Sequence, residues 1–210
     1  MLKRFVVAVT LAGCVWAADE SRPGLFLRED FKETPAATPI TQDHVANPEL
    51  VLSVHGPGKS GVKKSHHDKP ADDPYYVWSG TATGNWAVSV RHRKLAADLS
   101  GLAKIRWRTK QAGFRQLRLL VKTADGRWLV SDFATGPSND WHEAEIPVSN
   151  IRWRALDPQN IVEKRWVDNP DLTRVDEVGF TDLMTGGGSD ACSRIDWIEV
   201  WAKPVPRTPR

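Results

Sequence analysis

The chain has 210 residues, with 29 Lys and Arg, 26 Asp and Glu and a formal net charge of +3, and this length suffices for one domain that buries most of its surface. Without residues 1–17, which contain Lys3 and Arg4, the basic residues fall from 29 to 27 and the chain is nearly neutral. The net charge therefore gives no argument for nucleic-acid binding, the sequence has no concentrated basic stretch of the kind such binding requires, and we expect no nucleic-acid partner.

The first residues have the pattern of an export signal. Lys3 and Arg4 precede an apolar run that is shorter than the roughly 20 residues a membrane span needs, and small residues follow it. Two processing routes fit this pattern. Cleavage after Ala17 would release a soluble protein, whereas Leu11-Ala12-Gly13-Cys14 resembles a lipobox, in which Cys14 becomes a lipidated first residue. We therefore expect a signal peptide over residues 1–17 and an exported protein, periplasmic or extracellular, that is either free or lipid-anchored to the membrane.

Cys192 is then the only cysteine of the mature chain, which excludes an intramolecular disulfide. The core must be held by apolar burial, and we expect Cys192 to be a small buried residue and not a nucleophile.

The predicted elements are mostly short strands. Leu25-Phe26-Leu27 and residues 50–55 are expected as early strands, and Gly56-Pro57-Gly58 ends the second. From Trp86 onward, apolar and polar residues alternate with a period of two, which indicates strands with one buried face and places Trp86 in the core. Asp125-Gly126 predicts a tight hairpin between Val121 and Trp128. Short helical turns are expected at residues 96–102 and 158–167.

About ten short strands separated by turn signals are typical of a sandwich or jelly roll and not of alternating βα units. The sequence therefore predicts an all-β protein, with a single antiparallel β-sandwich over residues 21–203. Residues 204–210 hold three prolines and two arginines, and we expect them to form a disordered tail.

The middle of the chain resembles a known family. Asp98-Leu99-Ser100-Gly101, the strand at residues 104–108, the stretch from Trp141 to Ile146-Pro147 and the strand at residues 194–200 resemble the galactose-binding-like β-jelly rolls, especially the complex I intermediate-associated 30 kDa type and related carbohydrate-binding modules. The resemblance covers about half of the chain. It implies a jelly-roll fold and a sugar ligand but no reaction, and it assigns no ligand residue, because the segment around His66 and the glycines 186–188 have no place in the pattern.

The most suggestive run for chemistry extends from His66 to Trp78. A histidine beside an aspartate can act as an acid or base or bind a metal, although His66 and His67 point opposite ways on an extended chain and are not expected to reach one ion. The aromatic residues that follow can pack against sugar rings. Tyr75 and Tyr76 are consecutive, so one of them should face outward. The alternative is a plain solvated loop.

Arginines also recur at strand spacing opposite the apolar positions. On one concave face they would bind carboxylates or sulfates, but we favour a solvated face balanced by acidic residues. The candidate binding residues from the loop and from these strands are Asp68, Lys69, Asp72, Asp73, Tyr75, Tyr76, Trp78, Arg91, Arg106 and Arg108.

The glycine-rich stretch near the C-terminus is a weaker candidate. Asp182 and Asp190 with intervening carbonyl oxygens could hold a structural calcium ion, although a long hairpin loop is the simpler interpretation. No cofactor is required.

Three hypotheses for function follow. The first is an exported, monomeric carbohydrate-binding β-sandwich that recognises a polysaccharide or oligosaccharide and needs no catalysis. The second is a glycan-active enzyme, a polysaccharide lyase or glycoside hydrolase. In it His66 or His67 acts as acid or base, Arg106 or Arg108 neutralises a carboxylate, and Tyr75 or Tyr76 donates a proton. The third is an envelope scaffold or assembly protein, which would show an exposed apolar patch.

Overall fold

The computed structural model describes residues 22–80, 82–185 and 191–207. The export signal with Cys14, the glycines 186–188 and Asp190 lie outside these ranges. The described residues form fourteen strands and three short 3₁₀ turns, at Gln42–His44, Lys59–Gly61 and Val148–Asn150. None of their helices is long and apolar enough to cross a membrane. The predicted all-β antiparallel sandwich is confirmed.

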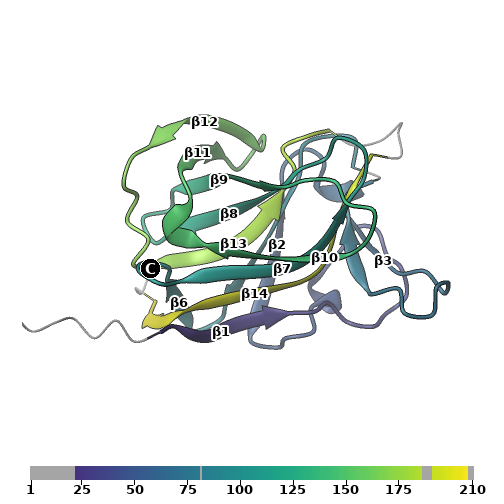
Figure 1. The fold of residues 1–210 in the computed structure, drawn as a ribbon, viewed down its shortest axis with the longest axis horizontal. Helices are drawn as coiled ribbons and strands as arrows, with labels where there is room; N and C mark the ends of the chain where they lie inside the picture. The colour runs from purple at the N-terminus through teal and green to yellow at the C-terminus, as the bar shows by residue number, and fades with distance from the viewer. Residues whose placement is uncertain (1–21, 81, 186–190, 208–210) are drawn as a thin grey trace, which may run out of the picture.

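The strands form two layers (Figure 1). The first, sheet A, contains β10 (His142–Pro147), β7 (Lys104–Gln111), β14 (Ser193–Pro206), β1 (Gly24–Glu29), β4 (Tyr76–Trp78) and β3 (Lys63–Ser65). The second, sheet B, runs in the order β12 (Val162–Val167), β11 (Trp153–Asp157), β9 (Trp128–Thr135), β8 (Leu117–Thr123), β13 (Val175–Thr181), β5 (Ala87–His92) and β2 (Leu50–His55), with β6 (Leu95–Asp98) beside β13. The long strand β14 belongs to both sheets, because residues 193–201 pair with β7 and residues 203–206 pair with β6.

The main core lies between the sheets and follows the predicted alternation. On β7, Ile105 and Trp107 are fully buried, while Arg106 and Arg108, which alternate with them, are partly exposed. The Trp107 indole N–H donates to the hydroxyl of Thr135 at 3.0 Å, which satisfies its one polar group inside the core. Trp86 is also buried, as predicted.

A second, smaller apolar cluster covers part of sheet B on the side away from the main core. Leu120 and Val130 are fully buried there, together with Leu156 and Ile161 from the β11–β12 hairpin. The alternation predicts one solvated face for these strands, but the hairpin folds over that face and buries it.

Three local predictions are wrong. Residues 96–102 and 158–167 do not form the predicted helical turns, because residues of β6 pair with the distant strands β13 and β14 and residues of β12 pair with β11 in a hairpin. The tail is ordered through Pro206 as the end of β14. Pro204 and Pro206 lie at alternate positions of this strand, so both can occupy non-hydrogen-bonded sites of the antiparallel pair with β6. Arg207 then donates to the backbone carbonyls of His92 and Leu95 at 2.9 and 3.1 Å.

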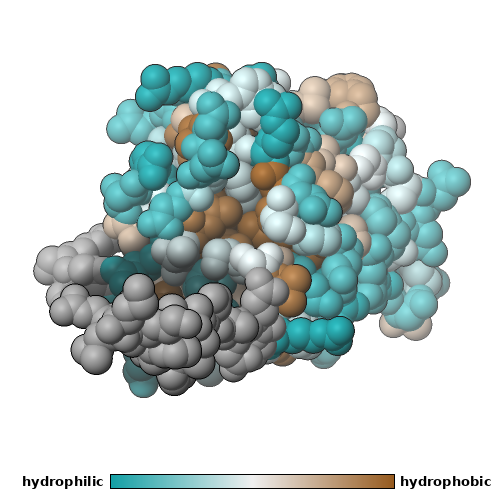
Figure 2. Space-filling view, turned by 60° about the vertical axis from the view of Figure 1, so that its left-hand side comes forward, coloured by the Kyte–Doolittle hydropathy of each residue, from teal (hydrophilic) through white to brown (hydrophobic). Residues whose placement is uncertain are grey.

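The hairpin between β8 and β9 lies where it was predicted, but its turn is longer than two residues. Residues 124–127 connect the strands, and Gly126 is the residue there with a positive φ, +86°. Most of the coloured surface in Figure 2 is hydrophilic, with hydrophobic residues gathered near the centre of the face shown.

Candidate functional site

A gap in sheet A creates the site. One side of β14 pairs with β7 along most of its length, whereas the other side pairs first with β4, at residues 194–195, and then with β1, at residues 198–202. Asp196 lies between these two pairings, at a register shift where β14 bulges against β7. Bulges redirect side chains next to binding sites, and here the bulge places Asp196 at the gap.

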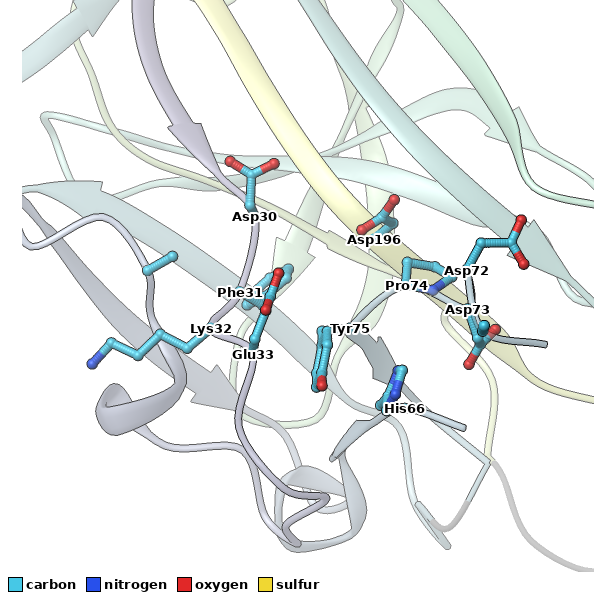
Figure 3. A pocket seen from close by; sticks show the side chains of 12 residues that line it. Asp30, Phe31, Lys32, Glu33, His66, Asp72, Asp73, Pro74, Tyr75 and Asp196 are labelled. Atoms are coloured by element: carbon cyan, nitrogen blue, oxygen red, sulfur yellow. The ribbon is translucent and has the colours of Figure 1, made fainter. Parts of the chain in front are cut away.

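A cavity of about 780 Å³ occupies this gap (Figure 3). Its walls come from the residues that follow β1, from the loop between β3 and β4, and from the β14 bulge. The lining residues are Asp30, Phe31, Lys32, Glu33, Ala46, His66, Ala71, Asp72, Asp73, Pro74, Tyr75 and Asp196. We call it the Tyr75 cavity.

Part of the predicted loop therefore reaches a common cavity, and part does not. Asp72, Asp73 and Tyr75 line it, whereas Asp68 and Lys69 are exposed and are not among the lining residues. Trp78 lies outside the cavity as well, with the Lys63 ammonium 5.4 Å from its ring centroid.

Tyr75 is held by strand β3. The His66 imidazole stacks on its ring with centroids 4.0 Å apart and an angle of 9° between the planes. The Lys64 ammonium lies 4.5 Å from the same ring centroid. Lys64 and His66 are two residues apart and so project to the same side of the strand. The phenol ring thus borders the cavity in a fixed position, with at least one face already covered.

Lys64 is the least expected residue of the site. Its side chain is fully buried, and its Nζ has no hydrogen-bond partner among the described residues. Burial lowers the pKa of Lys64 to about 8, although Asp196 and Glu33 act in the opposite direction. The Nδ1 atom of His66 is likewise buried without a partner. Polar groups under the cavity are therefore incompletely satisfied.

The cavity is acidic. Asp30, Glu33, Asp72, Asp73 and Asp196 line it, against one lining lysine, Lys32. Asp30 is paired with Arg28 at 2.6 Å and Asp196 with Arg108 at 2.7 Å. Burial raises the pKa of Asp196, and the hydrogen bond from Arg108 opposes this effect.

Two of these carboxylates are free to accept hydrogen bonds. Glu33 and Asp72 are exposed and form no ion pair with the described residues. Carboxylate oxygens of this kind are available to ligand hydroxyl groups, since an ionised carboxylate only accepts hydrogen bonds.

Beside the cavity, Asp73, His67 and Tyr76 are in contact. His67 Nδ1 lies 3.0 Å from the Asp73 carboxylate and 3.0 Å from the Tyr76 hydroxyl, and the His67 backbone N–H donates to Asp73 at 2.9 Å. Tyr76 is 2 % exposed, and burial raises the pKa of its hydroxyl. Tyr75 is only half-buried, so the two tyrosines differ as expected for consecutive strand residues.

The candidate arginines do not form one binding face. Arg106 and Arg108 lie on the outer face of sheet A, whereas Arg91 lies on β5 of sheet B. Arg106 donates to Glu143 at 2.9 Å and to Glu199 at 3.1 Å. This arrangement corresponds to a balanced, solvated face, and Arg108 reaches the cavity only through its bond to Asp196.

Asp182, one of the two predicted calcium ligands, forms buried hydrogen bonds with other side chains. Its carboxylate accepts hydrogen bonds from the buried guanidinium of Arg115 at 3.2 Å and from the Ser193 hydroxyl at 3.0 Å, and burial raises its pKa. No group of three or more potential metal-ligating side chains is present among the described residues. Because Asp190 lies outside those residues, the calcium site stays a prediction.

Comparison with known proteins finds similar solved structures but no similar sequence. No protein-family model and no curated protein matches the sequence. Among solved structures, the family 11 carbohydrate-binding module of a cellulosomal cellulase of Clostridium thermocellum shows 16 % identity over 86 % of this chain and 95 % of its own, with a TM-score of 0.43. The same module from Clostridium thermocellum with a β-1,3-1,4-mixed-linked tetrasaccharide shows 16 % identity over 80 % and 97 %, with a TM-score of 0.44.

A family 29 carbohydrate-binding module complexed with mannohexaose shows 12 % identity over 84 % of this chain and 92 % of its own, with a TM-score of 0.46. These structures belong to the class that the sequence resemblance names. Identities and TM-scores of this size assign no ligand-binding residue, so the site rests on the geometry of this chain alone.

Proposed function

We propose that the protein is an exported carbohydrate-binding β-sandwich, and that it binds an oligosaccharide or a segment of a polysaccharide in the Tyr75 cavity. The observation that carries this proposal is the cavity itself. A fixed aromatic ring and carboxylates without an ion-pair partner line an open space of about 780 Å³, within the usual size of ligand sites. Sugar rings offer C–H groups to aromatic surfaces and hydroxyl groups to carboxylates.

The negative charge of the Tyr75 cavity limits the class of sugar that can bind there. Five carboxylates line the cavity against one lysine, and two of them, Glu33 and Asp72, form no ion pair with the described residues, so the cavity repels a uronate or a sulfate group. We therefore propose an uncharged saccharide for this site. The acidic glycan that an arginine-bearing face would have favoured does not suit it.

The test is binding of the purified protein to a panel of neutral and acidic polysaccharides. We expect retention by a neutral polysaccharide, with at least a tenfold loss of affinity in Tyr75→Ala and Asp72→Asn. Asp68→Asn is the matched control, since Asp68 belongs to the same loop and has the same charge but does not line the cavity. Equal losses in Asp68→Asn and Asp72→Asn, or no binding to any neutral polysaccharide, would contradict the proposal.

A glycan-active enzyme is the second candidate, and one observation favours it. Asp73 and Tyr76 both contact Nδ1 of His67, so Nε2 of this exposed imidazole remains available as an acid or base. Tyr76 is too deeply buried to donate a proton to a ligand in the cavity. Release of oligosaccharide fragments by the wild type, lost in His67→Ala while binding persists, would favour the enzyme over the binding protein.

The third hypothesis, an envelope scaffold or assembly protein, predicts an exposed apolar patch, and the surface agrees with it less well than with a binding protein. Among the described residues, the exposed large apolar side chains do not gather on one segment: Leu25, Leu102 and Phe114 lie on three different segments, and Val162 and Trp166 share β12. Size-exclusion chromatography tests the proposed monomer.

The proposed export rests on residues 1–17. The mass and first residue of the protein recovered from cells separate its two routes. An N-terminus at Ala18 indicates ordinary cleavage, and a lipid-modified Cys14 that is lost in Cys14→Ser indicates an anchor. An intact Met1 in the cytoplasmic fraction would contradict both.

A further inference from the structure

The edge of sheet B carries a second candidate site. Trp166 on the edge strand β12 is 38 % exposed and lines two cavities, of about 350 and 670 Å³. Val167 and Asp168 also line both cavities. We call these residues and the two cavities the Trp166 ridge. In Figure 1, β12 lies at the opposite end of the sandwich from β3 and therefore far from the Tyr75 cavity.

Two arginines pack against the Trp166 ring. The guanidinium carbons of Arg152 and Arg154 each lie 4.3 Å from the indole centroid. Arg154 is opposite Trp166 in the β11–β12 register, and Arg152 precedes it by two residues on the same side. A guanidinium that stacks on an aromatic ring uses its flat face, so its N–H groups remain free at the edge to bind an anion in a bidentate manner.

Arg152 is the better placed of the two for a ligand. Arg152 lines the smaller cavity, and its guanidinium forms no hydrogen bond or ion pair with any described residue. Arg154 is partly engaged, with Glu163 at 3.7 Å and the Lys164 carbonyl at 3.4 Å. The indole thus holds one unpaired cation at the mouth of a cavity.

The larger cavity adds further positive charge. Arg127, Lys164 and Arg165 line it, and Asp168 is the acidic residue that lines either cavity. Arg127 and Lys164 have acidic partners outside the lining, whereas Arg165 is exposed and has none among the described residues. The charge of this site is therefore opposite to that of the Tyr75 cavity.

We propose that the Trp166 ridge is a second saccharide-binding site, and that it takes an acidic polysaccharide bearing carboxylate or sulfate groups. An anionic group pairs with Arg152, and Asp168 accepts hydrogen bonds from sugar hydroxyls. The two cavities share Trp166, Val167 and Asp168, so one chain that crosses the strand edge could occupy both. A nucleic acid fits less well, since DNA carries no free hydroxyl groups along its chain that could donate to Asp168, whereas each unit of a polysaccharide carries several. This site uses none of the residues of the Tyr75 cavity and does not depend on that cavity binding a ligand.

The test is binding of the purified protein to polygalacturonate, to dextran sulfate and to neutral dextran at low salt. We expect binding to one or both acidic polymers, weakened as salt is raised, and about a tenfold loss of affinity in Arg152→Gln and in Trp166→Ala. Lys94→Gln is the matched control, because it removes one positive charge from an exposed turn elsewhere. Its affinity should equal that of the wild type.

Two conservative variants separate the site from a general charge or folding effect. Arg152→Lys keeps the charge but loses the planar bidentate donors, and Trp166→Phe keeps a ring on the edge strand. We expect Arg152→Lys to bind less tightly than the wild type and Trp166→Phe to keep most of the affinity, with unchanged circular dichroism. The proposal is overturned if neither acidic polymer binds, if Lys94→Gln loses as much as Arg152→Gln, or if Tyr75→Ala abolishes this binding. Equal affinity for a DNA oligonucleotide would overturn the saccharide assignment.

Discussion

Replacing Lys64 by Met should stabilise the folded protein at neutral pH. The side chain is fully buried, its ammonium has no hydrogen-bond partner among the described residues, and burial lowers its pKa from 10.5 to about 8. The difference between these pKa values corresponds to about 3 kcal/mol by which folding disfavours the charged form at pH 7. Met occupies a similar volume without charge. The melting temperature should therefore rise by about 5–10 °C.

The stabilisation by Lys64→Met should depend on pH in a defined direction. Because the pKa is lower in the folded state, the unfolded chain holds more protons between pH 8 and 10.5, so the free energy of unfolding of the wild type rises across that window. Lys64→Met lacks this rise, and the two stabilities should converge near pH 10.5.

Urea unfolding from pH 6 to 10.5 measures both effects. Lys63→Met serves as the control, since Lys63 is adjacent but only partly buried. The reasoning is refuted if Lys64→Met is no more stable than the wild type at pH 7, or if the gap between them stays constant up to pH 10.5.

Three other predictions concern the sheets and the core. Gly179→Ala should unfold the protein or cost several kcal/mol, because an added Cβ would lie 2.0 Å from a backbone carbonyl oxygen of β5; soluble yield and thermal melting report this. Burial alone would raise the pKa of Glu177, but hydrogen bonds, one of them from Lys122, outweigh it and leave the pKa below its usual value, so Glu177 stabilises the fold above about pH 4.5. This contribution should be lost as pH falls, and Glu177→Gln should lack that loss in acid titrations. Thr135→Val should cost about 1–3 kcal/mol in urea unfolding by leaving the buried indole N–H of Trp107 unpaired, and unchanged stability would show that the hydrogen bond contributes nothing.

Much of the fold could be predicted from the sequence because a strand with one buried face leaves a local signal. Ile105 and Trp107 alternate with arginines, and the structure buries the first pair and partly exposes the second. Where a strand is covered on both faces, as at Leu120, the signal fails, because the covering residues come from the distant β11–β12 hairpin.

The candidate site was only partly predictable. The loop residues Asp72 and Tyr75 attract notice because polar and aromatic residues occur together. Asp196 and Lys64 carry no such signal. The position of Asp196 depends on β14 changing its partner from β4 to β1, and Lys64 is buried only because a short polar segment pairs as β3. Both positions therefore depend on pairing between strands and not on the local sequence around Asp196 or Lys64.

The pairing of the first and last strands also determines the order in which the chain can assemble. Gly24 lies opposite Ala202 and Leu25 opposite Trp201, so sheet A joins the two ends of the described chain. The same strand β14 then continues into sheet B through residues 203–206. A nascent chain cannot complete either layer before β14 is available, and contacts this distant in sequence slow folding. The native sandwich should therefore form only after β14 has been synthesised, although most of its other strands are made much earlier.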